Sequence, residues 1–346
     1  MCRGAYLLNA SMSSSLMTTE ILLCAACGKE EEDDNKLKFC TACNMVKYCN
    51  RECQIAHRRR HKKECRKRAA ELRDEALFAQ PPPNEDCPIC LITLPPIAQQ
   101  MYQSCCGKMI CKGCIGEHSD TYRKDFLASE YYEHAEEEEY PLCPFCRTRA
   151  SQSVEEEIKR LQNRSDMKDV NAMYILGNCY ETGDGVSRDV DKAIELWTQA
   201  TELGCVHASA LLADAYNPCV ERIVEGVPKD MNKVFHYYEI AAKGGNCMAR
   251  SNLGALEAAA GNMEASRKHY MISAAQGNDK ALMKIKQSYL DGDMTKDDFA
   301  KALRAHKHAQ DEMKSEHRTK WANKDGDKVK CTCLKCKVNA ANVFNY

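Results

Sequence analysis

Sixteen residues with metal-binding side chains are spaced as two consecutive sets of eight. The chain has 23 cysteines, and sixteen of them lie in its first 150 residues, where only Cys2 falls outside the two sets. The first set is Cys24, Cys27, Cys40, Cys43, Cys49, Cys53, His61 and Cys65. The second set is Cys87, Cys90, Cys105, Cys106, Cys111, Cys114, Cys143 and Cys146. Two thiolates separated by two residues share one tight turn, where both reach one Zn2+ at about 2.3 Å, and four ligands close a tetrahedral structural site. The two sets therefore predict four structural zinc ions.

The rival interpretation of these cysteines is a disulfide framework, which is typical of secreted proteins. The first 21 residues are too polar for a secretory signal, because serines interrupt any apolar stretch between Ser11 and Ser15. No run approaches the roughly 18 apolar residues of a membrane-spanning helix. We therefore expect zinc thiolates, a reducing cytoplasmic or nuclear compartment, and no membrane contact.

Charge is nearly balanced over the chain but uneven along it. The formal net charge is −1 over 346 residues, so the chain as a whole has no field for nucleic acid, which we do not expect as a partner. The stretch from Arg58 to Arg68 nevertheless carries eight basic residues. This stretch is interpreted as a solvated helix face, with a nuclear localisation signal or a nucleic-acid contact as the alternative.

The first set of ligands resembles a MYND-type zinc finger over residues 24–65. The resemblance rests on the gap to the second cysteine pair, the Tyr48-Cys49 step, and the ending in which His61 lies one helical turn before Cys65. It implies that Cys24, Cys27, Cys49 and Cys53 hold one zinc, and Cys40, Cys43, His61 and Cys65 the other. It also implies binding of short proline-containing peptides without catalysis. The aromatic residue that the family carries on its peptide-binding face is replaced here by Arg58.

The second set resembles a RING finger at both ends, in Cys87-Pro88-Ile89-Cys90 and in Cys143-Pro144-Phe145-Cys146-Arg147. Lys108 stands at the position of the family's central histidine, and an ammonium group cannot bind zinc, so Cys105 is expected to replace it. The implied cross-brace pairs Cys87, Cys90, Cys111 and Cys114 at one zinc, and Cys105, Cys106, Cys143 and Cys146 at the other. The resemblance further implies that Ile89 and Pro144 contact a ubiquitin-conjugating enzyme, and that Arg147 hydrogen-bonds both this enzyme and ubiquitin.

Two functions of different classes follow from these resemblances. The first is a RING-type ubiquitin-protein ligase that holds a conjugating enzyme in a reactive pose, while the other modules recruit protein substrates. The alternative is a non-enzymatic adaptor whose zinc modules only bind proteins. The sequence shows no Gly-rich phosphate loop and no Ser/His/Asp or Cys/His set outside the zinc patterns, so catalysis by side chains is not expected.

Small and apolar residues recur at helical spacing in the second half of the chain. The recurring positions are Ala172, Ala208, Ala249 and Ala281, then Leu176, Leu212, Leu253 and Ile285, with Gly204, Gly245 and Gly277 before the later alanines. The pattern resembles Sel1-like repeats, helical hairpins that stack and bind protein partners. We expect Leu212 to be buried between hairpins and Gly245 to have a positive φ. The remaining cysteines of this half, Cys179, Cys205, Cys219 and Cys247, are expected to be small core residues.

The predicted fold class is therefore multi-domain, with two small zinc-stabilised cross-brace modules followed by an all-α helical-hairpin repeat solenoid. The predicted segments are a flexible N-terminus (1–23), the MYND-type finger (24–65), a helical and proline-rich linker (66–86), the RING-like finger (87–147), a charged helical linker (148–168), the repeats (169–307), and the end of the last helix with a polar tail (308–346). The tail holds Cys331, Cys333 and Cys336 without a fourth ligand nearby.

Overall fold

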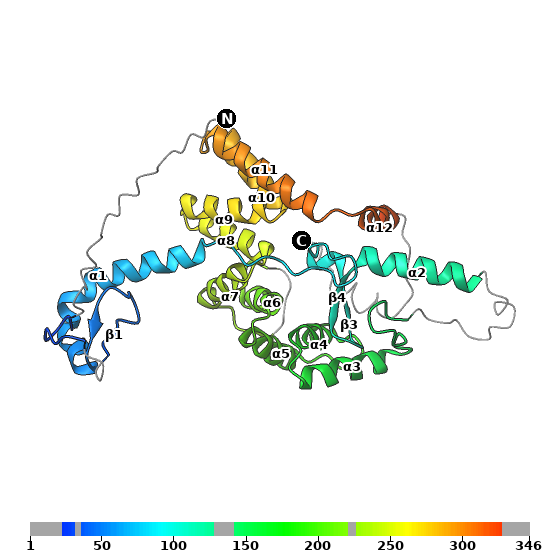
Figure 1. The fold of residues 1–346 in the computed structure, drawn as a ribbon, viewed down its shortest axis with the longest axis horizontal. Helices are drawn as coiled ribbons and strands as arrows, with labels where there is room; N and C mark the ends of the chain where they lie inside the picture. Colours follow the sequence, from blue (N-terminus) through cyan, green and yellow to red (C-terminus); the bar gives the residue numbers. More distant parts are fainter. Residues whose placement is uncertain (1–22, 32–35, 128–141, 221–225, 327–346) are drawn as a thin grey trace, which may run out of the picture. The chain divides into compact units, whose positions relative to one another are not determined.

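The computed structural model describes residues 23–31, 36–127, 142–220 and 226–326, in two compact units, Met1–Ala76 and Leu77–Tyr346 (Figure 1). The predicted flexible N-terminus lies outside the described residues except for its last residue, as do the three cysteines of the predicted tail. Each unit is described by itself below. No helix among the described residues is long and apolar enough to cross a membrane.

The first unit is a small zinc finger followed by one long helix. Strands β1 (Lys38–Phe39) and β2 (Lys47–Tyr48) pair antiparallel, and α1 extends over Arg51–Leu77. The side chain of Asn50 accepts a hydrogen bond from the backbone N–H of Cys53 at 2.8 Å and so caps the first turn of α1. Among the described residues of this unit, the buried hydrophobic core of the finger contains only Leu37 and Tyr48 besides three ligand cysteines. A core this small cannot hold a fold without further cross-links.

The second unit begins with the other zinc module. A short 3-10 helix, η1 (Ile97–Gln99), leads into the antiparallel hairpin of β3 (Gln100–Gln103) and β4 (Lys108–Cys111), and α2 (Lys112–Leu127) follows at once. Gly107, with a φ of +73°, makes the turn between the two strands. Leu94 and Ile110 are buried against the ligand cysteines.

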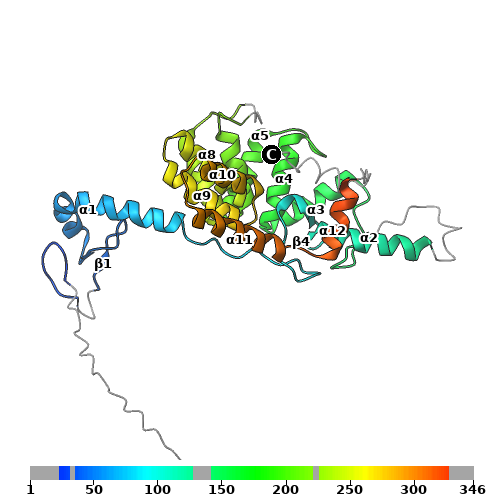
Figure 2. The same ribbon diagram turned by 90° about the horizontal axis from the view of Figure 1, so that it is seen from above.

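Helices make up the rest of the second unit, and they stack as successive hairpins (Figure 2). They are α3 (Val154–Asp166), α4 (Val170–Thr182), α5 (Val190–Glu202), α6 (Val206–Tyr216), α7 (Met231–Lys243), α8 (Cys247–Ala259), α9 (Met263–Ala275), α10 (Asp279–Leu290), α11 (Lys296–Glu312) and α12 (Glu316–Gly326). Neighbouring helices pack α4 on α5, α6 on α7 and α8 on α9.

The repeat frame predicted from the sequence is confirmed in the packing. All four of its alanines are at most 1% exposed, and Leu212 is fully buried. Gly245 has a φ of +100°, which a side chain with a Cβ would adopt only with strain. Cys179 and Cys205 are buried as expected. The expectation for Cys219 is wrong: its side chain is exposed, because it follows the end of α6 instead of lying on a helix.

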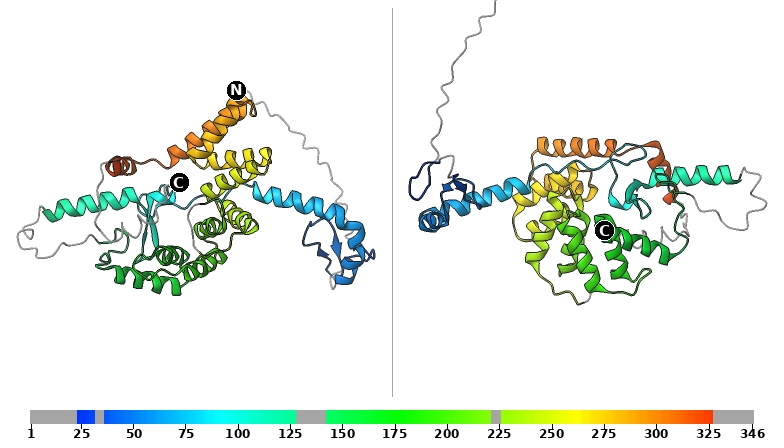
Figure 3. Two further views of the ribbon diagram at one scale, coloured as in Figure 1. Left: turned by 180° about the vertical axis from the view of Figure 1, so that it is seen from behind. Right: turned by 60° about the horizontal axis from the view of Figure 1, so that its bottom comes forward.

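Side-chain hydrogen bonds join the second zinc module to the first helices of the repeat region. The hydroxyl of Tyr102 on β3 donates to Oδ2 of Asp169 at 2.7 Å, while Oδ1 of Asp169 caps α4. The guanidinium of Arg164 on α3 donates to the carbonyl oxygens of Ser104 at 2.9 Å and Cys105 at 3.1 Å. Buried Glu157 accepts from the Ser104 hydroxyl at 2.8 Å. This module and the helices that follow it are therefore one packed body, as the views in Figure 3 also show.

Candidate metal centres

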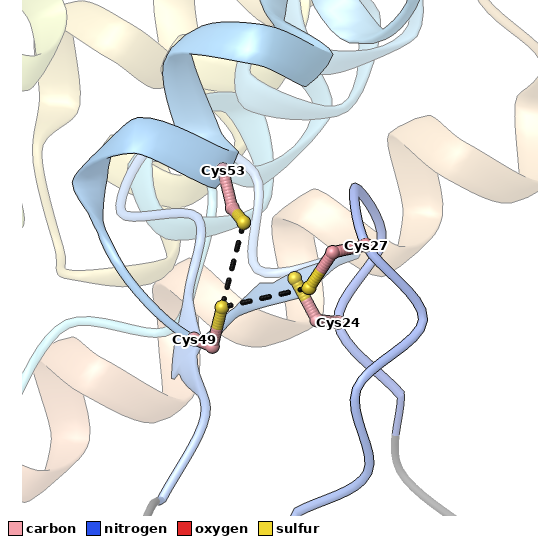
Figure 4. Close-up of side chains that lie close together, drawn as sticks. All are labelled: Cys24, Cys27, Cys49 and Cys53. Atoms are coloured by element: carbon pink, nitrogen blue, oxygen red, sulfur yellow. Dashed lines mark hydrogen bonds between the residues drawn. The ribbon is translucent and has the colours of Figure 1, made fainter.

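The structure brings the sixteen predicted ligands together as four clusters, each with four donor atoms within 4.8 Å of one another. In the finger, the clusters are Cys24, Cys27, Cys49 and Cys53, drawn in Figure 4, and Cys40, Cys43, His61 and Cys65. In the second module, they are Cys87, Cys90, Cys111 and Cys114, and Cys105, Cys106, Cys143 and Cys146. The grouping is the interleaved one that both resemblances imply, including Cys105 at the position that lacks a histidine.

The spacing of the sulfur atoms matches a tetrahedral zinc site and excludes disulfides. Ligands about 2.3 Å from a central zinc at tetrahedral angles lie about 3.8 Å from each other. The Sγ atoms of Cys27 and Cys49 are 3.7 Å apart, and those of Cys106 and Cys143 are 3.9 Å apart. A disulfide would bring two sulfurs to about 2.05 Å. Three clusters offer four thiolates each, and the fourth offers three thiolates and the imidazole of His61. Zinc prefers these sulfur and nitrogen donors, so the residues present fit this metal.

Four of the cysteine pairs form the same backbone turn, which explains how each places two sulfurs on one side. The backbone N–H of the residue after the pair donates at 2.9 Å to the carbonyl of the first cysteine. The four donors are Gly28, Asn44, Leu91 and Arg147. Each of these residues has a positive φ, between 53° and 73°. The sequence prediction missed this requirement, although glycine and asparagine after a Cys-x2-Cys pair indicate it.

The remaining ligands of the finger lie just before and along α1, and those of the second module lie in the β3–β4 turn, at the end of β4 and at the start of α2. Cys53, His61 and Cys65 lie on α1, so the histidine and the cysteine one turn later face the same side, as predicted. His61 is buried, and its Nε2 lies 3.2 Å from Sγ of Cys43. His57 is not a member of any cluster: its Nδ1 shares a hydrogen bond with the Tyr48 hydroxyl at 3.1 Å. Its ring stacks on His61 and supports that ligand's orientation.

The thiols of one finger cluster differ in pKa, and a cation is needed for all four of them to ionise. Burial alone would raise the pKa of Cys24, but hydrogen bonds from the backbone N–H groups of Cys27 and nearby residues lower it to about 6. Contact with Cys49, together with burial, raises the pKa of Cys53 to about 12. One thiolate forms readily and then opposes ionisation of its neighbours. Four thiolates can therefore coexist here only with a bound dication to offset their charge.

The second module shows the same division between its thiols. Burial raises the pKa of Cys87, yet backbone N–H groups outweigh it and bring the pKa to about 7. At the other cluster, hydrogen bonds from Thr148 overcome burial and lower the pKa of Cys146 to about 6. Burial and contact with Cys146 raise the pKa of Cys105. Burial and contact with Cys111 likewise raise the pKa of Cys114, so each cluster of this module holds a cysteine that needs a metal to become a thiolate.

The Cys-x2-Cys turns described above are called knuckles from here on. The residues predicted to contact a conjugating enzyme lie on or next to the knuckles of the second module. Ile89 is 40% exposed, Pro144 is half-buried, and Arg147 is exposed. Two further apolar residues that the sequence did not single out, Leu91 and Phe145, are 76% and 45% exposed. Arg147 has a structural role in addition, since its backbone closes the last knuckle. The module thus presents apolar side chains to solvent beside both metal clusters.

The repeat region contributes a concave site of its own. A groove of about 480 Å³ lies between α3, α4 and α5. Its walls include Met173, Leu176 and Tyr180, with Lys192 and Glu202 among its charged residues. The groove combines apolar walls with charges of both signs. Such a concave lining fits a polypeptide segment better than a flat surface does.

Two protein families match parts of the chain. The MYND finger family matches residues 24–65, and the Sel1 repeat family matches residues 170–205 and 224–246. Neither match falls on residues 87–147, so the resemblance to RING fingers gains no support from these comparisons. No curated protein matches the chain.

Two solved structures that are similar to this chain each cover a little less than half of it. A Sel1 repeat protein from Oxalobacter formigenes has 28% identity, covers 47% of this chain and 66% of its own, and has a TM-score of 0.40. The antigen c5321 of uropathogenic Escherichia coli has 21% identity, covers 45% of this chain and 34% of its own, and has a TM-score of 0.39. The chain carries a zinc-binding MYND finger and a further cysteine-rich module, followed by a helical Sel1-like repeat region.

Proposed function

We propose that this chain is a non-enzymatic adaptor, in which four structural zinc ions hold two small protein-binding modules and the helical repeats bind a further protein segment. One observation carries the proposal. Each of the four clusters contains four protein donors, so a bound zinc keeps no open position for a substrate or an activated water. The zinc ions then stabilise surfaces, and the function belongs to those surfaces. Zinc thiolates also favour a reducing compartment, cytoplasmic or nuclear.

The finger offers an apolar and basic surface to a partner. Phe39, Met45 and Ile55 are 53%, 52% and 61% exposed. Lys47 lies over the Phe39 ring at 4.7 Å, and Arg58 is exposed at the position where related fingers carry an aromatic residue. The Lys47 ammonium is already paired with Glu31 at 2.8 Å, whereas Arg58 has no ion pair among the described residues. We therefore propose that the finger prefers peptides with an acidic residue that reaches Arg58 beside the apolar or proline positions.

A specific observation favours ligase activity as the second candidate. The ligands of the second module interleave in the order that RING fingers use, and Ile89 is exposed on the first knuckle. This candidate predicts that the full chain forms ubiquitin chains on itself with at least one conjugating enzyme. Ile89→Ala and Arg147→Ala should then reduce this activity while retaining zinc, because neither side chain is a ligand.

One pair of assays separates the two candidates. The zinc-loaded full chain is first tested for ubiquitin transfer with a panel of conjugating enzymes, and the adaptor proposal expects no transfer. Transfer that Ile89→Ala abolishes would replace the adaptor by the ligase.

The second assay selects peptides that bind the chain from a displayed library. We expect one class of peptides to be lost with His61→Ala, which removes a ligand of the finger, and another with Lys192→Glu in the groove. Lys301→Glu on α11, exposed and outside the groove, is the matched control and should lose neither class. A library that yields no peptide dependent on either site would contradict the adaptor.

A further inference from the structure

The last described helix, α12, crosses α2 of the second zinc module and packs against it (Figures 1 and 2). Two glycines, Gly113 and Gly116, lie three residues apart on the contacted face of α2. A Cβ at Gly113 would come within 2.8 Å of the backbone nitrogen of Arg318, and one at Gly116 would overlap the Trp321 ring. Glycine is unfavourable inside a helix relative to alanine. Here it permits a close approach that any side chain would block.

Arg318 inserts its side chain from α12 into the first knuckle of the module. Only 8% of this residue is exposed. Its Nη1 donates to the carbonyl oxygen of Thr93 at 2.7 Å, and its Nη2 donates to that of Ile92 at 3.1 Å. The same Nη2 lies 3.5 Å from Sγ of Cys90, a ligand of the first metal cluster. The guanidinium therefore binds the loop that presents this ligand and also the ligand itself.

The buried charge of Arg318 has no carboxylate to balance it. No Asp or Glu of the described residues lies within ion-pair distance of it, and its Nε has no partner. An uncompensated buried charge is strongly unfavourable. Four thiolates around one Zn2+ carry a net charge of about −2, which is the compensation that Arg318 lacks. The neutral thiols of a metal-free site would not supply it.

The periphery of the contact adds charge pairs that are weaker. Lys320 of α12 lies 2.8 Å from Glu117 and 3.9 Å from Asp120, both on α2. These groups are partly exposed to solvent, and ion pairs at the surface contribute little in water. They orient α12 on α2 but do not reach the metal cluster. Lys320 is therefore a suitable internal control for Arg318, since both are cations on the same helix.

We propose that α12 is an intramolecular ligand of the second zinc module, and that Arg318 is an outer-sphere residue of the metal site formed by Cys87, Cys90, Cys111 and Cys114. This inference rests on the zinc sites of the proposed function. Zinc binding at that site and docking of α12 stabilise each other, because any coupling between two binding events is reciprocal. The docked helix also covers one face of α2. An outside protein reaches that face only after α12 is displaced, and loss of this zinc displaces it.

The first test measures zinc retention by the full chain against a chromophoric chelator. Outer-sphere partners change metal affinity by about 10- to 100-fold, so Arg318→Ala should weaken one of the four zinc ions by at least tenfold and leave the other three unchanged. Lys320→Ala should change none of them by more than about twofold. Arg318→Ala with all four zinc ions retained as in the parent would overturn the proposal.

A second variant keeps the test valid if Arg318→Ala fails to fold. Trp321→Ala removes packing of α12 on Gly116 without touching a ligand or the knuckle. It should weaken the same zinc ion, because docking and metal binding are coupled. Equal zinc retention by this variant and the parent would contradict the coupling.

The reverse direction is read by hydrogen exchange of the parent chain. Removal of zinc should abolish the protection of backbone amides in α12 while the amides of α8 and α9 keep theirs. Unchanged protection of α12 after all zinc has been removed would refute metal-dependent docking. A parent chain that binds no zinc at all would instead refute the proposed function, so the two failures are distinguishable.

Discussion

The two zinc modules use the same knuckle but differ in what supports them. In the finger, the core consists of ligand cysteines with Leu37 and Tyr48, and the long helix that follows is exposed along most of its length. The second module also buries little besides its ligands, yet Tyr102 and Arg164 connect it to the helices of its own unit. A metal site can therefore be either the whole core of a module or one cross-link among several. The difference predicts unequal responses to metal loss and to mutation.

Metal removal should produce the largest difference between the modules. Zinc binding contributes about 10–16 kcal/mol to the folding of finger-sized peptides, and the described residues of the finger form no other core that could replace it. We expect chelation to abolish hydrogen-exchange protection throughout residues 36–65, and to leave β3, β4 and α3 partly protected. Equal loss in both modules would show that the hydrogen bonds of Tyr102 and Arg164 give no independent support. Loss of protection in α6 to α9 would contradict the separation of the repeats from the metal sites.

A cavity in the repeats should affect one unit only. Leu212 is fully buried in the core that also contains Tyr102 and Leu161. Leu212→Ala should cost about 2–5 kcal/mol, the usual range for a buried leucine. The free energy of unfolding of the second unit should fall by this amount, while the finger keeps its zinc. Met283→Ala on α10, whose side chain is 63% exposed, is the control and should change stability little. A Leu212→Ala chain as stable as the parent would mean that the repeat frame is misread.

The link between β3 and the start of the repeats can be removed by deleting one hydroxyl. Tyr102→Phe keeps the buried ring but loses the hydrogen bond to the Asp169 carboxylate. A hydrogen bond to a charged group contributes about 1.5–3 kcal/mol, and we expect a loss of this size in denaturant unfolding of the second unit. Tyr216→Phe is the control, because Tyr216 is also buried but its hydroxyl has no partner in the described part of the chain. Equal stability of both variants would contradict the role given to Asp169.

The smallest expected effect concerns the knuckles. Leu91 has a φ of +54°, and a leucine in this left-handed conformation is strained by about 1–2 kcal/mol. Because its side chain is 76% exposed, Leu91→Gly should lose little packing and stabilise the second module by about 1 kcal/mol. Asn44→Gly in the finger should gain less, since asparagine tolerates this conformation. Thermal unfolding of the zinc-loaded variants measures the two changes in stability. If Leu91→Gly is less stable than the parent, the Leu91 side chain must pack within the chain itself.

Local spacing was sufficient to predict the features that depend on residues close in sequence. The pairing of two cysteines on one turn follows from their spacing, whereas the grouping of the pairs into four sites was implied by the family resemblances. The burial of Leu212 and the positive φ of Gly245 follow from helical periodicity. The contacts of Tyr102 with Asp169 and of Arg318 with Cys90 join residues far apart in the chain. Such pairs leave no periodic pattern, and nothing in the sequence marks Tyr102, Asp169 or Arg318 as a partner of a distant residue.

The residue after each knuckle was predictable in only two cases. Gly28 and Asn44 are the usual residues for a left-handed backbone, whereas leucine and arginine, present at positions 91 and 147, rarely adopt it and so do not indicate the turn. The sequence assigned a role in ubiquitin transfer to Arg147, and that role stays a proposal. Its backbone function, closing the knuckle onto Cys143, became visible only with the hydrogen bonds.

The central claim, that this chain is organised around four closed zinc sites, is tested most directly by native mass spectrometry of the full chain. The account predicts a mass that corresponds to four zinc ions, and three for Cys105→Ser, since that cysteine completes the fourth site. His57→Ala should retain all four, because His57 is not a ligand. A parent chain with two zinc ions, or a Cys105→Ser chain that still carries four, would contradict the assignment.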